Sequence, residues 1–182
     1  MVTPTFDTIR SRRVSSARAT RADGECLRYR LDVVAASAAD VVQSAGGWLY
    51  DRVMAGWEVS VLLPHAGDAR SLRILGVRAF DGAGPDLTWS RSQSLAVSAE
   101  AFTADPLVRQ KVLASLGDRL TEVALWGDGW PLGVDRAMTR TQHVLSAAAR
   151  RFKGYALAAA GLPCESVGPT ETLLCDLATR LD

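Results

Sequence analysis

The sequence predicts a single α/β domain, and two patterns carry this prediction. One is a strand–helix–strand unit between about residues 27 and 64, and the other is a long amphipathic helix near residues 134–160. The chain has 182 residues, of which 48% are hydrophobic and 23% are charged, as is typical of one globular domain with its own core. We expect two or three layers around a mixed, partly parallel sheet of about four to five strands.

The strand–helix–strand unit begins with residues 27–34, which alternate apolar and charged side chains as a half-buried strand does. Ser37 or Asp40 caps the following helix, which Gly56 ends. Residues 58–63 form the second strand, and Pro64 stops it. A connection of this length predicts a right-handed crossover between two parallel strands.

The elements further along the chain are predicted from similar patterns. We expect a third strand over residues 72–80, a loop over 81–86, a short edge strand over 94–99, a helix over 105–116 and a strand over 120–126. Apolar residues then recur at spacings of three and four from Val134 to Ala159, which predicts the long helix near 134–160. A short C-terminal helix over residues 170–181 completes the domain.

Composition predicts how the chain is divided and in which cellular compartment it is found. Residues 1–24 read as a flexible Arg-rich tail, and residues 25–182 as the single domain. Three cysteines without a C-x-x-C pair indicate reduced thiols in a cytoplasm. Arginine outnumbers lysine 19 to 2, which indicates a bacterial chain. The sequence contains no apolar run of membrane-spanning length, so we expect no membrane association.

Sequence motifs of known catalytic classes are missing from the chain. It has no phosphate-loop, dinucleotide, zinc-protease or serine-hydrolase motif, and its two histidines are not spaced with the cysteines as zinc ligands are. The sequence therefore predicts no cofactor and no metal, and it does not favour an enzyme.

The glycine pair Gly46-Gly47 is the first candidate for a binding site. Each glycine inside a helix costs about 1 kcal/mol relative to alanine, so a second role must offset that cost. The pair is either a notch for close helix packing, which we favour, or a source of free N–H groups for an anion such as a phosphate. The segment from Gly46 to Leu63 resembles the first crossover of nucleotide-sugar glycosyltransferases, which implies a nucleotide-sugar ligand.

The predicted ends of the strands supply the second candidate site. His65, Asp68, Asp81 and Asp128 follow three predicted strands, where open α/β sheets bind their ligands. Together with the glycine pair they predict a cleft with a general base. Plain solvation of polar loops is the alternative, and we favour it.

Two tryptophans flank a tight glycine turn, and this is the third candidate. Trp126 and Trp130 either fill the core from a loop, which we favour, or anchor a partner.

The polar face of the predicted long helix is the fourth candidate. It is basic, with only Asp135 opposing Arg136, Arg140, His143, Arg150, Arg151 and Lys153. Such a single-sign face fits phosphates or an acidic protein, although pairing within the chain is the alternative.

The sequence thus predicts a non-enzymatic interaction or regulatory protein. It would bind an acidic protein or a nucleic acid through the basic helix face and the basic tail. The alternative is a small-molecule protein or enzyme, with a nucleotide or nucleotide-sugar site at the carboxyl ends of the strands. The oligomeric state is not predicted.

Overall fold

The computed structural model describes residues 21–22, 25–26, 29–65, 67, 69–82, 94–118 and 121–176. The strands are β1 (Arg21–Ala22), β2 (Glu25–Cys26), β3 (Arg30–Val34), β4 (Glu58–Leu63), β5 (Arg78–Asp81), β6 (Ser94–Ser98), β7 (Glu122–Trp126), β8 (Met138–Val144) and β9 (Thr170–Asp176). The helices are α1 (Ala38–Met54), α2 (Arg70–Ile74), α3 (Ala99–Ala104), α4 (Pro106–Asp118), α5 (Leu132–Ala137) and α6 (Ala147–Ala159). The predicted tail lies outside the described residues, except for Arg21 and Ala22.

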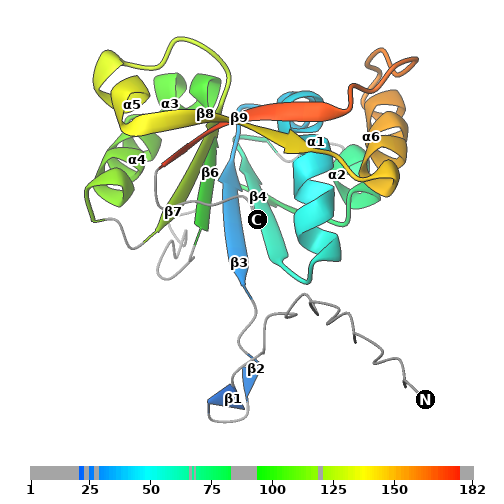
Figure 1. The fold of residues 1–182 in the computed structure, drawn as a ribbon, viewed down its shortest axis with the longest axis horizontal. Helices are drawn as coiled ribbons and strands as arrows, with labels where there is room; N and C mark the ends of the chain where they lie inside the picture. The colour runs from blue at the N-terminus through cyan, green and yellow to red at the C-terminus, as the bar shows by residue number, and fades with distance from the viewer. Residues whose placement is uncertain are drawn as a thin grey trace, which may run out of the picture.

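Seven strands form one mixed sheet in the order β5-β4-β3-β6-β7-β9-β8 (Figure 1). The first five in this order are parallel, whereas β9 runs antiparallel to β7 and β8 antiparallel to β9. The predicted mixed α/β class is confirmed, but the sheet has more strands than expected. Strands β1 and β2 pair in antiparallel fashion in a separate two-stranded sheet.

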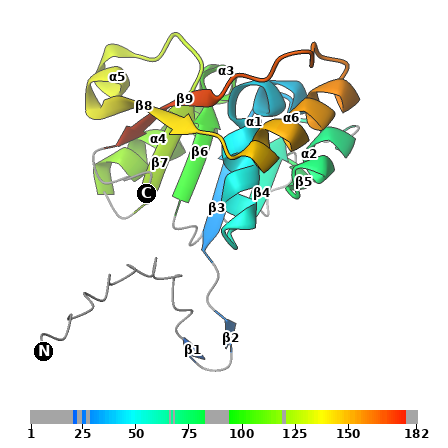
Figure 2. The same cartoon turned by 45° about the vertical axis from the view of Figure 1, so that its right-hand side comes forward.

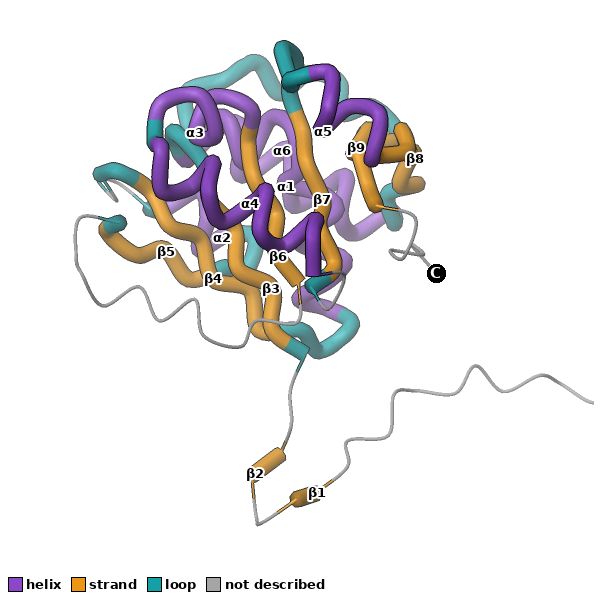
Figure 3. Tube along the Cα trace, turned by 90° about the vertical axis from the view of Figure 1, so that its left-hand side faces the viewer, coloured by secondary structure: helices purple, strands orange, loops and turns teal. Residues whose placement is uncertain are grey.

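Helices cover both faces of the sheet, so the fold has three layers (Figures 2 and 3). Helices α1, α2 and α6 pack with one face in a cluster that includes Leu49, Leu72 and Ala156. Helices α3, α4 and α5 pack with the other face in a second cluster that includes Phe102 and Val112. Both clusters use the same strands because neighbouring residues of a strand point to opposite faces.

The predicted strand–helix–strand unit is confirmed as β3, α1 and β4. The two strands pair in parallel from Arg30↔Glu58 to Val34↔Leu62. The Ser37 side chain accepts a hydrogen bond from the Asp40 N–H and caps α1. Gly56 follows the helix with φ +92°, a left-handed conformation that suits glycine and ends the helix.

The predicted long helix over 134–160 is wrong, because three elements occupy that segment. Helix α5 ends at Ala137, β8 runs from Met138 to Val144, and α6 begins at Ala147. The segment contains Thr139, Thr141 and Val144, whose β-branched side chains suit a strand.

Three other predicted elements need correction. Residues 72–80 contain the end of α2 and the start of β5, separated by Gly76 at φ +76°. The segment predicted as an edge strand is β6, which lies between β3 and β7 at the centre of the sheet. The segment predicted as a C-terminal helix over residues 170–181 forms the strand β9 over its first seven residues, and its remainder lies outside the described residues. The helix predicted over 105–116 is present as α4.

None of the described helices is both long and apolar enough to cross a membrane.

Candidate functional site

A pocket of about 280 Å³ opens at the carboxyl ends of the parallel strands. The chain leaves β3 for β4 on one side, whereas β6 lies on the other side of β3. The connections therefore diverge between β3 and β6, and open α/β sheets bind their ligands at such a point. The pocket lies beside it, between the ends of β3 and β4 and the helices α3 and α4. We call it the carboxyl-edge pocket.

The wall of this pocket is mostly apolar. Val34, Leu62 and Leu63 come from the strand ends, and Ala101 and Val108 come from the helices that follow β6. The remaining lining residues are Ala35, Ala36, Pro64, Gly82, Ala104 and Asp105. This lining suits an apolar group of a small molecule, since ligand pockets combine apolar walls with a few polar groups.

Among the described residues that line the pocket, Asp105 is the one that carries a charge. It precedes Pro106, the first residue of α4, and its Oδ1 accepts the Leu107 N–H at 2.8 Å. This is the geometry of a helix cap, which fixes the direction of the carboxylate. Asp105 is exposed, so its carboxylate is open to solvent at the mouth of the pocket.

The residues predicted to form a cleft are only partly brought together. His65 follows the lining residue Pro64, and Asp81 precedes the lining residue Gly82, so both lie near the pocket, and both are exposed. Asp128 is exposed in the turn after β7. Asp68 lies outside the described residues.

Gly46 and Gly47 do not reach this edge of the sheet, because they are buried inside α1. A Cβ on Gly46 would lie 3.3 Å from Leu75 Cδ1, and a Cβ on Gly47 only 2.6 Å from the Leu145 methyl carbons. The pair therefore provides close packing, as we favoured.

The N–H groups at the glycine pair also hold an anion, and it belongs to the chain itself. The carboxylate of Glu171 accepts the Gly47 N–H at 2.9 Å and the Trp48 N–H at 2.7 Å. Lys153 Nζ lies 2.5 Å from Glu171 Oε1 and donates a second bond, at 2.7 Å, to the Gln43 carbonyl. We call these residues the α1 clamp. In this clamp the buried charges of Glu171 and Lys153 form hydrogen bonds with backbone groups from the middle of α1.

The predicted basic face does not exist as one surface. Arg136 belongs to α5, Arg140 and His143 to β8, and Arg150, Arg151 and Lys153 to α6. Lys153 is buried in the α1 clamp, and His143 Nε2 lies 2.9 Å from Asp51 Oδ2. The apparent stripe came from assuming one continuous helix.

The two tryptophans of the glycine turn pack into the protein. Trp126 is buried at the end of β7, and its Nε1–H donates to Asp40 Oδ1 at 3.1 Å. Trp130 is half-buried and packs on the Phe102 ring with 4.9 Å between centroids. Its Nε1–H donates to the Gly127 carbonyl.

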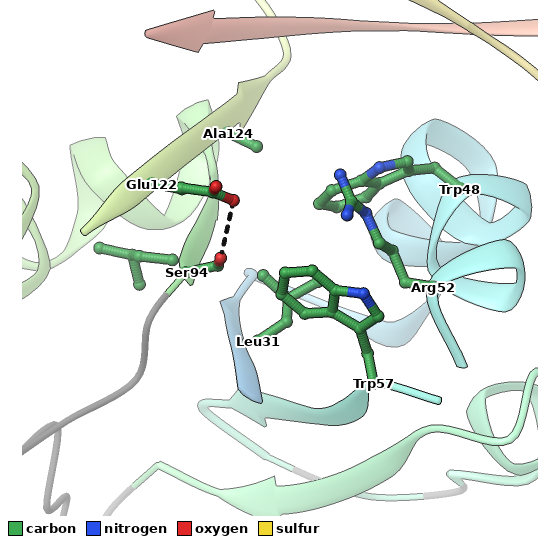
Figure 4. Close-up of a pocket in the computed structure, with 8 residues that line it drawn as sticks. Leu31, Trp48, Arg52, Trp57, Ser94, Glu122 and Ala124 are labelled. Carbon is green, nitrogen blue, oxygen red and sulfur yellow. Dashed lines mark hydrogen bonds between the residues drawn. The ribbon is translucent and has the colours of Figure 1, made fainter. Parts of the chain in front are cut away.

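A second, smaller cavity lies at the amino ends of the strands (Figure 4). The Arg52 guanidinium lies 4.6 Å from the Trp57 ring centroid and 5.6 Å from that of Trp48, and it faces Glu122. Ser94 donates to Glu122 from the neighbouring strand. Burial lowers the pKa of Arg52, and the Glu122 carboxylate opposes that shift. The cavity holds about 10 Å³, room for roughly one water molecule, and is too small for a ligand.

Cys175 interacts electrostatically with Arg52 and Glu122, two lining residues of the second cavity. Burial raises the pKa of the Cys175 thiol to about 11, so this thiol is protonated and a poor nucleophile at neutral pH. Within the described ranges, no three His, Cys, Asp or Glu side chains gather as a metal site.

Sequence reasoning missed the residues that line the carboxyl-edge pocket. Ala35 and Ala36 carry no chemical signal of their own, and Ala101 belongs to a helix that was not predicted. Asp105 had a signal, since Asp before Pro at a helix start is typical of a cap, but nothing connected it with β3 and β4.

Comparisons with solved structures identify proteins of similar fold. A teicoplanin-biosynthesis deacetylase in a bog complex matches with a TM-score of 0.57 and 14% identity, over 80% of this chain and 97% of the other. A deacetylase–teicoplanin complex matches with a TM-score of 0.56 and 15% identity, over 80% and 97% of the two chains. The A40926 pseudoaglycone deacetylase matches with a TM-score of 0.56 and 15% identity, over 86% of this chain and 100% of the other. No protein-family model and no curated protein matches the chain.

These matches correct the predicted function. The chain has a fold found in deacetylases, which are enzymes, so the prediction of a non-enzymatic interaction or regulatory protein is wrong. The alternative prediction, a small-molecule site at the carboxyl ends of the strands, agrees better with this fold.

Proposed function

We propose that this chain is a small-molecule-processing protein whose ligand enters the carboxyl-edge pocket. The observation that carries the proposal is the position of this pocket beside the point where the strand connections diverge, in a fold that deacetylases share. The ligand has an apolar group that contacts Val34, Leu62 and Val108, and a polar head that Asp105 contacts as a hydrogen-bond acceptor.

The pocket does not favour the nucleotide or nucleotide-sugar version of this function. Phosphate sites use cationic side chains or free N–H groups at a helix start. None of the described lining residues is a cation, and the Asp105 carboxylate already occupies the start of α4. An amphipathic molecule with an N-acyl group fits this lining better. Removal of that acyl group is the reaction to measure.

The test uses N-octanoyl-glucosamine, which combines a hydroxylated head with an eight-carbon acyl chain. Calorimetric titration of the full chain measures binding, and detection of the released amine measures acyl removal. We expect saturable binding. Ala104→Trp places an indole at the pocket mouth, where it should keep about two methylene groups of the acyl chain out of the pocket. The lost burial of these two groups should weaken binding at least about tenfold.

Ala114→Trp is the matched control. Ala114 is exposed on α4 and does not line the pocket, so the same substitution there should leave affinity unchanged. Thermal unfolding of both variants checks that each remains folded. If the unmodified chain shows no saturable binding, or if both variants bind as it does, the pocket is not the site of the proposed function.

A further inference from the structure

The sheet ends at β8, and the outer edge of this strand pairs with no strand among the described residues. Figure 3 shows β8 outside β9, at the margin of the molecule. On its inner side β8 pairs with β9 along its whole length, from Met138↔Asp176 to Val144↔Thr170. A regular strand with one open side can add a further strand.

The direction of each backbone group of β8 follows from its ladder with β9. The Leu145 N–H donates to the Pro169 carbonyl at 2.8 Å, which continues the ladder by one pair. Residues in antiparallel pairing alternate between directing both backbone groups toward the neighbour and away from it. The odd-numbered residues of β8 therefore face β9. Arg140, Gln142 and Val144 direct their N–H and C=O groups outward, where no described residue bonds them.

This edge has few of the features that usually protect a sheet from pairing with another chain. Edge strands are typically short or bulged, or they carry proline or charged side chains, lysine above all. The opposite edge of the sheet, β5, has only four residues, and two of them are Arg78 and Asp81. In contrast, β8 has seven residues with no proline and no break in register, and Arg140 is its one Arg, Lys, Asp or Glu. The two edges therefore differ in their capacity to pair.

We propose that β8 pairs in antiparallel fashion with β8 of a second copy of this chain, about a two-fold axis at Thr141. Hydrogen bonds between the two strands form only where outward-directed backbone groups of one strand lie opposite those of the other. Even-numbered residues must therefore pair with even-numbered residues. An axis at Thr141 places Arg140 opposite Gln142 of the second copy, and Met138 opposite its Val144. Every residue of β8 then has a partner.

Charge and length exclude the neighbouring registers. An axis at Arg140 would set two arginines directly opposite each other, which destabilises a strand pair. An axis at Gln142 would leave Met138 beyond the end of the other strand. The Thr141 register also covers Val144, a large apolar side chain that is 72% exposed in the single chain. Self-complementarity thus favours a second copy over an unrelated strand.

The test is sedimentation equilibrium of the full chain, with variants at Gln142. We expect a monomer–dimer equilibrium. Gln142→Glu sets a carboxylate opposite Arg140 of the second copy and should lower the dimer Kd by roughly tenfold, since two such pairs form. Gln142→Arg sets like charges opposite and should raise the Kd by a similar factor. A dimer through another surface would not respond with opposite signs.

Gln142→Pro tests the edge without adding charge. The Gln142 N–H faces away from β9, so proline removes no bond within the chain, and the fold should remain by circular dichroism. This variant should be monomeric. If it fails to fold, the Glu and Arg variants still decide. A chain that stays monomeric at all concentrations overturns the proposal, as does a dimer that none of the three variants affects.

Discussion

Gly47 combines two roles that the sequence presents as alternatives. Its missing side chain leaves space for Leu145, and its N–H binds the Glu171 carboxylate. The sequence predicts the anomaly, because a glycine pair inside a helix is costly. It does not predict the anion, because Glu171 lies 124 residues further along the chain and is brought there by the fold.

We expect Gly46→Ala and Gly47→Ala to differ in stability. Alanine gains about 1 kcal/mol over glycine in a helix. At Gly46 the new methyl group meets Leu75 at 3.3 Å, so a small shift accommodates it and the net change is close to zero. At Gly47 it meets Leu145 at 2.6 Å, and overpacking of roughly 1–3 kcal/mol outweighs the gain. Urea unfolding measures both.

A Leu145→Ala background provides the control for this pair. Leu145→Ala alone creates a cavity and costs roughly 2–5 kcal/mol. In that background Gly47→Ala should become neutral or stabilising, because the clash is gone and the methyl group fills part of the cavity. Equal effects of Gly47→Ala in both backgrounds would show that Leu145 is not what requires glycine there.

At the scale of elements, the α1 clamp joins parts of the chain that the sequence does not connect. Glu171 lies on β9, Lys153 on α6, and the backbone groups of Gln43 and Gly47 on α1. In an ideal helix the Gly47 N–H would bond the Gln43 carbonyl. Here Glu171 and Lys153 bind these two groups, so the ion pair links α1 to both other elements.

Lys153→Met should destabilise the protein by roughly 3–5 kcal/mol, because it leaves the buried Glu171 charge without its cation. The double variant Lys153→Met/Glu171→Gln removes that charge and keeps an acceptor for the Gly47 N–H. We expect it to regain a large part of the lost stability. Urea unfolding of the two variants measures this recovery. If the double variant is no more stable than the single one, the cost lies in lost packing of Lys153 and not in the unpaired charge.

The elements that sequence predicted well are those whose pattern depends only on local residues. Ser37, Gly56 and Pro64 mark the limits of α1 and β4 by capping, helix ending and chain stiffness. The segment 134–160 misled prediction because Val134, Met138 and Leu145 have helical spacing, yet they belong to α5, β8 and the turn before α6. Similarly, β9 became a strand because β7 and β8 both pair with it, which no local pattern reveals.

At the scale of the whole molecule, one continuous sheet carries both apolar clusters. The general position of the candidate pocket was predictable from where the predicted strands end, because ligands of open α/β sheets bind at the carboxyl ends of the strands. Its lining was not predictable. The lining forms only because β3 lies beside β6 and because the unpredicted helix α3 lies near β4. In addition, the lining residues Ala36 and Ala101 are apolar and give no chemical signal in the sequence.

Acid stability of the whole molecule should depend on Asp51, which ties α1 to β8 and to the start of α6. Asp51 Oδ2 lies 2.9 Å from His143 Nε2 and accepts the Ser146 N–H at 3.2 Å. Burial alone raises the pKa of Asp51, but the hydrogen bonds from Ser146 and His143 outweigh it and hold the pKa below the ordinary value of 3.8. Such a carboxylate stabilises the fold above its unfolded pKa, and this contribution disappears as pH falls through its folded pKa.

We therefore expect Asp51→Asn to lower the free energy of unfolding by roughly 1–2 kcal/mol at about pH 7, because it weakens hydrogen bonds to a charged group. The difference from the unmodified chain should begin to shrink as the pH falls below the unfolded value of 3.8, and it should be smallest below the still lower folded pKa, where the folded unmodified chain also lacks the charge. Urea unfolding at several pH values measures it. Asp128→Asn, at an exposed carboxylate in the turn after β7, is the control and should have little effect at any pH. A difference for Asp51→Asn that stays constant into strong acid would mean that shape, and not charge, makes this contact stabilising.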